Sequence, residues 1–248
     1  MEGYDVYQDI SERTEGCIYI GVVGPVRTGK STFIKRFMDL LVLPNMDNEF
    51  KRERTRDELP QSANGKTIMT TEPKFVPNEP IELTLRENAK FKVRLVDCVG
   101  YLVEGAMGHL EDNSPRMVNT PWFEDRIPFE EAAEIGTRKV IADHSTIGLV
   151  VTTDGSITDL PRRSYIEAEE RVIKELKELE KPFIVALNSA RPKAQETIEL
   201  REALETKYNT PVMIIDALKM EMDDLEGILG KILFEFPARE INFHIPRW

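Results

Sequence analysis

The feature that most constrains this chain is a glycine-rich run, GVVGPVRTGKSTFIK, at residues 21–35. An apolar stretch precedes it and a helical pattern follows it, which is the context that a phosphate-binding loop requires. Backbone N–H groups and a helix N-terminus would then point into one concavity that suits an anion. The pattern predicts that Lys30 reaches the β- and γ-phosphates of a nucleotide and that the Ser31 hydroxyl ligates Mg²⁺. The predicted loop comprises Gly24, Pro25, Val26, Arg27, Thr28, Gly29, Lys30, Ser31 and Thr32.

Short apolar runs rich in branched residues predict buried strands, and helical patterns lie between them. This alternation implies a mostly parallel central sheet with helices on both faces. With a phosphate loop after the first strand, the predicted fold is a three-layer α/β P-loop NTPase of the GTPase-like (TRAFAC) type. IELTLRE, at 81–87, alternates and predicts an antiparallel strand beside residues 91–97. The runs are CIYIGVV (17–23), FKVRLVD (91–97), TIGLVVTT (146–153), KPFIVALN (181–188) and TPVMIID (210–216).

Two polar segments, residues 42–80 and 101–129, do not fit the alternation. Loops of this length in a compact domain are usually functional or mobile. We expect both to be irregular and to change order with the state of the nucleotide. KRERTR, at 51–56, is the best candidate for a basic patch, but its interleaved acid favours a solvated loop or helix face.

The length of 248 residues fits one large domain or a domain with a small appendage. We expect an N-terminal segment at 1–16, a nucleotide-binding domain at 17–237 and the start of a following segment at 238–248. The last residues, EINFHIPRW, alternate like a strand and then stop, which predicts that the natural chain is longer.

The composition limits which binding partners and which cellular compartment are expected for this chain. A formal net charge of -11 argues against a bulk electrostatic partnership with nucleic acid. Two cysteines make no disulfide framework, and acids stand where a secretory signal would have bases. No apolar run approaches the length needed to cross a membrane. We therefore expect a cytoplasmic location, with any membrane attachment indirect.

A second predicted piece of the site is Asp97-Cys98-Val99-Gly100, at the end of an apolar strand. A carboxylate there would lie beside the phosphate loop and hold Mg²⁺ or its water. Gly100 could offer its N–H to the γ-phosphate. In the irregular segment before it, Thr70 and Thr71 are both candidates for the threonine that senses Mg²⁺ and the γ-phosphate in a GTPase-like fold, and a threonine pair at a strand edge is the alternative.

The end of the fourth apolar run should face the base. GTPases use Asn-Lys-x-Asp there, and this chain has Asn188-Ser189-Ala190-Arg191. Arg191 has no acceptor for guanine N1 and N2. The sequence therefore favours adenine, with Asn188 and Arg191 as residues at the base.

Two positions bear on which side chains could stabilise the negative charge that develops on the phosphates during hydrolysis. Tyr101 follows Gly100, where Ras-like enzymes place a water-orienting glutamine. Arg27 lies inside the phosphate loop and could stabilise the leaving phosphate. Alternatively, Arg27 points to solvent or pairs with a nearby acid.

These motifs together resemble the stage IV sporulation protein A family, whose members build the basement layer of the bacterial spore coat. The resemblance covers essentially the whole chain and is most specific in GVVGPVRTGKSTFIK, DELPQSANGKTIMTTEPKFVPN, VRLVDCVGY, PFEEAAEIGTRKVI and IEAEERVIKELKE. It implies an ATPase with a GTPase-like fold that polymerises around the forespore. It implies Lys30 on the phosphates, Asp97 at magnesium, and Thr70 and Thr71 as the sensing pair. It also implies C-terminal parts, absent here, that dock on the forespore membrane through a small amphipathic peptide.

Arg-x-Gly-Lys-Ser also resembles the phosphate loop of guanylate-binding proteins and atlastins. There the arginine acts as a finger supplied in cis when protomers meet, which implies a catalytic role for Arg27.

The leading hypothesis is therefore an ATPase, using ATP and Mg²⁺, whose turnover drives self-assembly of a spore-coat scaffold in the mother cell, at the forespore surface. Its partners would be further copies of itself, the amphipathic peptide and other coat proteins. The alternatives are a GTPase molecular switch and a nucleotide-locked scaffold without turnover. A small-molecule kinase fits the phosphate loop alone. Residues 109, 144 and 244, the three histidines, show no metal spacing.

Overall fold

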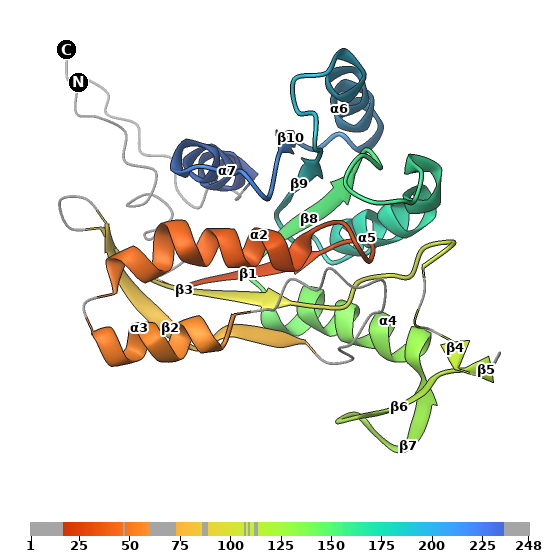
Figure 1. Ribbon diagram of the computed structural model, residues 1–248, viewed down its shortest axis with the longest axis horizontal. Coiled ribbons are helices and arrows are strands. Elements are labelled where there is room, and N and C mark those ends of the chain that lie inside the picture. The colour runs from red at the N-terminus through yellow and green to blue at the C-terminus, as the bar shows by residue number, and fades with distance from the viewer. Residues whose placement is uncertain are drawn as a thin grey trace, which may run out of the picture.

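The computed structural model describes residues 17–46, 48–59, 73–85, 89–106, 108, 110–111 and 114–235. Its centre is a six-stranded sheet with the order β10-β9-β8-β1-β3-β2 (Figure 1). All neighbouring pairs are parallel except β2 and β3, which are antiparallel, as predicted for residues 81–87. The strands are β1 (Cys17–Val23), β2 (Lys74–Leu85), β3 (Ala89–Asp97), β8 (Ile147–Thr153), β9 (Phe183–Asn188) and β10 (Val212–Ile215).

Helices cover both faces of this sheet, because its strands are apolar on both sides. In β8, Ile147, Leu149 and Val151 pack in one core cluster and Val150 in the other. The first cluster includes residues of α2 and α7, and the second includes residues of α5 and α6. The three-layer α/β prediction is confirmed. The helices are α2 (Lys30–Phe37), α3 (Glu49–Asp57), α4 (Phe129–Lys139), α5 (Ile166–Glu178), α6 (Gln195–Tyr208) and α7 (Met222–Glu235).

The topology determines where along the carboxyl ends of the strands a ligand can bind. From β1 the chain builds β2 and β3 on one side, and then crosses to β8 on the other. Ligands of open α/β sheets bind at the carboxyl ends of the strands where the order reverses in this way. The phosphate loop follows β1 at that point. Shorter turns extend several helices: η1 (Met38–Val42) and η2 (Leu43–Asn45) follow α2, η3 (Val140–His144) follows α4, and η4 (Arg162–Tyr165) precedes α5.

The prediction that residues 42–80 are irregular is wrong for α3, which lies within them. This helix buries only Thr55, so it has no apolar stripe for a sequence pattern to detect. Local hydrogen bonds define it instead. The Asn48 side chain caps its start by accepting from the Lys51 N–H at 3.0 Å, and Arg54 pairs with Glu58 at 3.3 Å. KRERTR is thus a solvated helix face.

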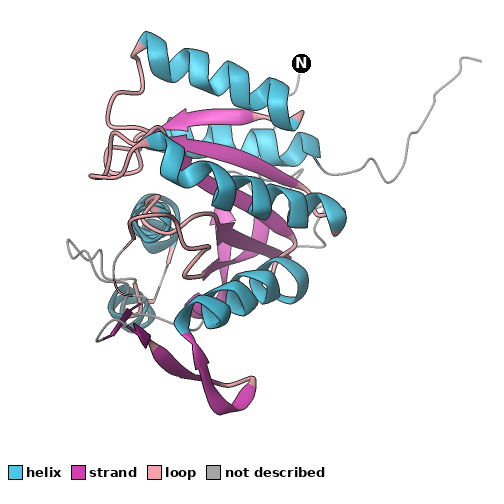
Figure 2. Ribbon diagram, turned by 90° about the vertical axis from the view of Figure 1, so that its right-hand side faces the viewer, coloured by secondary structure: helices cyan, strands magenta, loops and turns pink. Residues whose placement is uncertain are grey.

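The segment 101–129 is also more regular than predicted. It contains two short antiparallel pairs, and the longer pair projects from the body of the domain (Figures 1 and 2). Val118 packs with Phe129 and Ala132 of α4, while Met117 and Phe123 are exposed. Of the four strands only β6 alternates exposed and buried positions, and β4, β5 and β7 have no buried position, so they lack the continuous apolar run that marks the central strands. They are β4 (Leu110–Glu111), β5 (Ser114–Pro115), β6 (Met117–Thr120) and β7 (Phe123–Pro128).

Within the described part of the chain, no helix is both long and apolar enough to cross a membrane. Cys98 is a free, buried thiol, and burial raises its pKa to about 11. It therefore stays protonated at neutral pH, as expected for an inert cysteine.

Candidate functional site

Gly24–Gly29 forms the predicted phosphate loop between β1 and α2. Gly24 has φ 138°, and a Cβ there would lie 2.2 Å from the carbonyl oxygen of Val151. Gly29 has φ 92°, and a Cβ there would lie 2.4 Å from Nδ2 of Asn188. Both glycines are therefore required by backbone conformation and by close packing. The loop is held tightly against β8 and the end of β9.

Lys30 is buried at the start of α2, with 5% of its surface exposed. Its Nζ donates to the carbonyl oxygens of Pro25 at 2.6 Å and Gly24 at 3.4 Å. Burial lowers the pKa of Lys30, and the nearby Cys98 and Asp97 oppose this shift. The amine is thus directed into the concave side of the loop, where phosphate oxygens would bind.

Asp97 meets Ser31 where β3 ends beside β1. Ser31 Oγ donates to Asp97 Oδ2 at 2.7 Å. The second carboxylate oxygen, Oδ1, is buried and has no hydrogen-bond partner among the described residues. Burial raises the pKa of Asp97, while the Ser31 hydrogen bond and the Lys30 charge lower it in part. A buried carboxylate oxygen without a donor, next to a hydroxyl, is a donor set that fits a hard cation such as Mg²⁺.

Gly100 closes the phosphate end of the site. It has φ 90°, and a Cβ there would lie 2.1 Å from the Gly24 carbonyl oxygen and 2.6 Å from Lys30 Nζ. The predicted pieces Gly24, Lys30, Asp97 and Gly100 therefore converge. Tyr101, in contrast, is buried and directs its hydroxyl to Glu175 of α5. It does not occupy the place of a water-orienting side chain.

Arg27 has φ 62°, a left-handed conformation that is uncommon outside glycine. Its side chain is partly buried. Within the residues that the structure describes, it makes no ion pair with an acid, and its role stays a prediction. Its charge acts on Tyr165, just before α5: burial raises the pKa of Tyr165, and Arg27 opposes the rise.

Asn188, at the end of β9, joins two loops at the edge where the base was predicted to bind, and its contact with the base stays a prediction. Its Nδ2 donates to the Thr28 carbonyl oxygen at 3.0 Å, and its Oδ1 accepts from the Ala217 N–H at 3.0 Å. Both polar ends are thus used to join the phosphate loop to the segment after β10. Asn188 therefore positions the loops, and each end of its amide keeps one further hydrogen-bonding capacity, a second N–H on Nδ2 and a second lone pair on Oδ1.

Arg191 is exposed, and only its backbone has hydrogen bonds in the described part of the chain, with its N–H donating to Ser189 Oγ at 2.9 Å. Ser189 is fully buried. The Arg191 side chain is the only charged group of the Asn188–Arg191 segment, and it is exposed to solvent.

A further residue at this edge, Asp154, was not predicted. Its carboxylate accepts from Ser189 Oγ at 2.6 Å, from Thr197 Oγ1 at 3.2 Å and from the Ser156 N–H at 2.8 Å. Burial alone would raise the Asp154 pKa, but the hydrogen bonds from Ser156 and Ser189 outweigh it and leave the pKa lowered. The signal was available in principle, since Asp154 directly follows an apolar strand that ends at the same edge as the phosphate loop.

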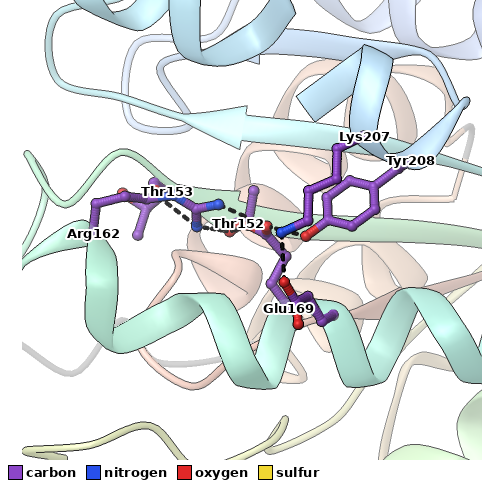
Figure 3. A network of polar contacts seen from close by, with 7 residues as sticks. Thr152, Thr153, Arg162, Glu169, Lys207 and Tyr208 are labelled. Atoms are coloured by element: carbon purple, nitrogen blue, oxygen red, sulfur yellow. Dashed lines mark hydrogen bonds and ion pairs between the residues drawn. The ribbon is translucent and has the colours of Figure 1, made fainter. Parts of the chain in front are cut away.

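The segment carrying Asp154 is anchored by a buried network (Figure 3). Glu169 of α5 is fully buried and accepts from Thr152, from Arg162 at 2.6 Å and from Tyr208 at 2.7 Å. Arg162 also reaches the Thr153 carbonyl oxygen at 3.4 Å. The network joins β8, η4, α5 and α6. A glutamate on the apolar face of a helix gives no sequence signal for such a partner set.

Thr70 and Thr71, the predicted sensing pair, lie outside the described residues. The remaining loop positions fall where predicted. Thr28 is buried and donates to the Pro25 carbonyl oxygen at 3.0 Å, and Val26 is buried. Thr32 lies in the first turn of α2.

Comparison with known proteins gives a consistent result along the chain. Residues 1–237 match the model of the family described as stage IV sporulation protein A, ATPase domain. Proteins named stage IV sporulation protein A are 59% identical in Clostridioides difficile (strain 630), over 98% of this chain, and 58% identical in Bacillus subtilis (strain 168), over all of it. The chain spans about half the length of these relatives, 50% in each case. A solved variant of SsGBP matches with a TM-score of 0.48 and 16% identity, over 91% of this chain and 58% of that chain.

Proposed function

This chain belongs to the family of stage IV sporulation protein A ATPase domains, and on that premise we propose that it binds ATP with Mg²⁺ and hydrolyses it at the carboxyl edge of its sheet. The observation that carries the proposal is the convergence of Lys30, Ser31, Asp97 and Gly100 around one concave loop. Backbone N–H groups, a buried amine and a carboxylate with an unpaired oxygen are the groups that phosphoryl transfer uses.

Each residue around the loop would have its own role in binding ATP and Mg²⁺. Lys30 would bind phosphate oxygens, since its buried amine is already directed into the loop. Ser31 and Asp97 would hold Mg²⁺, which supplies positive charge against the phosphates when bound. Gly100 would offer its N–H at the place where no side chain fits. Thr70 and Thr71 remain predicted sensors of the ion and of the γ-phosphate.

Arg27 would stabilise, with its guanidinium, the negative charge that develops on the leaving phosphate. Its backbone is part of the loop and its side chain has no acidic partner in the described structure. A guanidinium can bridge two oxygens, and its effect is large where water is scarce. With Tyr101 directed to α5, the chain has no glutamine-like group at that position, which increases the need for Arg27.

We further propose that turnover drives assembly of copies of this chain into a spore-coat scaffold. The family name supports a role in sporulation. The scaffold would form in the mother-cell cytoplasm at the forespore surface. A small amphipathic peptide and other coat proteins would bind parts of the longer relatives that this chain does not span, so contact with the membrane would be indirect.

One alternative has support from the structure. A nucleotide-locked scaffold without turnover would suit the absence of a water-orienting side chain at Tyr101. A GTPase switch is disfavoured, because Arg191 stands where guanine needs a carboxylate.

The proposal is tested by phosphate release from ATP in the presence of Mg²⁺, at several protein concentrations, with Lys30→Ala as the control. We expect the native chain to exceed the control by at least about 10²-fold, and the rate per molecule to rise with concentration if assembly completes the site. Equal rates for the two proteins would leave the nucleotide-locked scaffold as the function.

A further inference from the structure

The backbone of Tyr101 is bonded directly to the phosphate loop. The Val26 N–H donates to the Tyr101 carbonyl oxygen at 2.9 Å, and Pro25 and Tyr101 form an isolated β-bridge. Through the preceding residue this contact also places Gly100 against Gly24 and Lys30. The position of Tyr101 thus determines how the Asp97–Gly100 turn lies on the loop that would bind phosphate.

The side chain of Tyr101 is held from the opposite direction, by helix α5. Its hydroxyl donates to Glu175 Oε2, and the guanidinium of Arg171 lies 4.5 Å from the centre of its ring. Arg171 is itself held by two hydrogen bonds to Glu134 of α4, one of them at 2.7 Å, and by Glu175 at 3.8 Å. Burial and the Glu175 hydrogen bond both raise the pKa of Tyr101, so the phenol remains a donor.

The same helix carries a second tyrosine–glutamate pair that serves as a comparison. Tyr208 donates to Glu169 of α5 at 2.7 Å (Figure 3). Tyr208 lies on α6 and has no bond to the phosphate loop among its described contacts. Both tyrosines are buried and both bond a carboxylate of α5, but of the two only Tyr101 has a described backbone hydrogen bond to the phosphate loop.

We propose that Glu175 and Arg171 are positioning residues, which hold Tyr101 and through its backbone keep the Gly100 turn seated on the phosphate loop. They touch neither nucleotide nor metal in this assignment. Their catalytic effect rests on the proposed hydrolysis, whereas their effect on the loop does not. A displacement of about 1 Å in a reacting geometry can cost up to about 10²-fold in rate, so a distant anchor can matter.

The test compares Tyr101→Phe with Tyr208→Phe in two measurements. The first is hydrogen exchange of the Val26 amide without nucleotide, which reports the bond to Tyr101. We expect exchange to speed up roughly tenfold in Tyr101→Phe and to change less than about twofold in Tyr208→Phe. The second is ATP turnover, where we expect kcat to fall roughly tenfold in Tyr101→Phe with KM within about threefold, and kcat to change by less than about threefold in Tyr208→Phe.

Variants of Glu175 separate positioning from general damage to the fold. Glu175→Ala should reproduce Tyr101→Phe, and adding Tyr101→Phe to it should have little further effect. Glu175→Gln keeps an acceptor for the phenol and should restore kcat to within about threefold of native. Equal changes in Tyr101→Phe and Tyr208→Phe, or a kcat for Tyr101→Phe within about twofold of an active native protein, would overturn the inference.

The two proposals fail in different ways. If native turnover equals that of Lys30→Ala, hydrolysis is wrong, and exchange at Val26 still decides the anchor. If exchange at Val26 is the same in all variants, the anchor is wrong whatever the native rate.

Discussion

At the phosphate end of the site, neighbouring atoms occupy the space that a side chain on any of three glycines would need, whereas at the base end side-chain hydrogen bonds hold the loops. A Cβ on Gly24, Gly29 or Gly100 would lie 2.1–2.4 Å from another atom. Around Asn188 and Asp154, the Asn188 amide donates to the Thr28 carbonyl oxygen and the Ser189 hydroxyl donates to the Asp154 carboxylate, while Arg191 is exposed. A glycine whose Cβ would clash with a neighbouring atom tolerates no substitution, whereas an exposed position such as Arg191 tolerates many. The comparison explains how the end that would read the base can depart from the GTPase pattern while the phosphate end retains it.

Two aspartates that follow strands of the same sheet give the largest expected contrast. Asp97→Asn should lower kcat about 10³-fold, because it removes the charge that would hold Mg²⁺, and nucleotide affinity should change by less than about tenfold. Asp154→Asn is the matched control at the base end, with an expected kcat within about threefold of native. Steady-state kinetics over a range of Mg²⁺ concentrations checks both. Similar losses of kcat in the two variants would remove the distinction between the ends.

The next effect in size concerns Arg27. Arg27→Ala should lower kcat about 10²-fold, since the guanidinium would stabilise charge on the leaving phosphate. Arg27→Lys should not restore the rate, because an ammonium cannot bridge two oxygens as the planar fork does. Turnover per molecule should rise with protein concentration in the native chain and stay flat in Arg27→Ala. A saturated rate within about twofold of native would exclude Arg27 from the mechanism.

Asn188 tests the link between the two ends. Asn188→Ala leaves the Thr28 carbonyl and the Ala217 N–H without their partner, and should cost about 2–4 kcal/mol of unfolding free energy. We also expect roughly tenfold weaker binding of ATP, because the loop loses its tie to the segment after β10. Denaturant unfolding and equilibrium binding measure the two effects. Native stability in Asn188→Ala would mean that the glycine packing alone holds the loop.

The smallest effect should come from Arg191. Arg191→Asp restores an acceptor where guanine needs one, and should shift the ratio of GTP to ATP affinity by less than about tenfold, since the rest of the site is not built for guanine. Arg191→Ala separates loss of the cation from gain of the acid. Competition binding with both nucleotides is the measurement. A shift equal in both variants would show that the new carboxylate does not contact the base.

The elements that the sequence predicted are those that apolar burial defines. CIYIGVV and TIGLVVTT are recognisable as strands because both of their faces are covered. The loop before Lys30 is recognisable because only glycine fits at Gly24 and Gly29. What escaped prediction depends on polar contacts between distant segments. Helix α3 has a single buried residue, β6 has two buried positions and β7 has none.

The same limit applies to the site. Asp97 was predicted from its place at the end of a strand, and the structure brings it to Ser31. The sequence could place Asn188 at the base end, but could not show that both ends of its amide bond backbone groups. Nor could it show that Tyr101 is directed to Glu175, since that contact joins residues 74 positions apart.

The central claim, that the phosphate end carries the chemistry and the base end only positions the nucleotide, is tested most directly by hydrolysis of ATP and GTP side by side with the native chain. We expect the two kcat values to agree within about threefold, and the preference for ATP to lie in KM and to be modest, below about tenfold. A preference that lies in kcat, or a kcat/KM that favours GTP tenfold or more, would contradict the account.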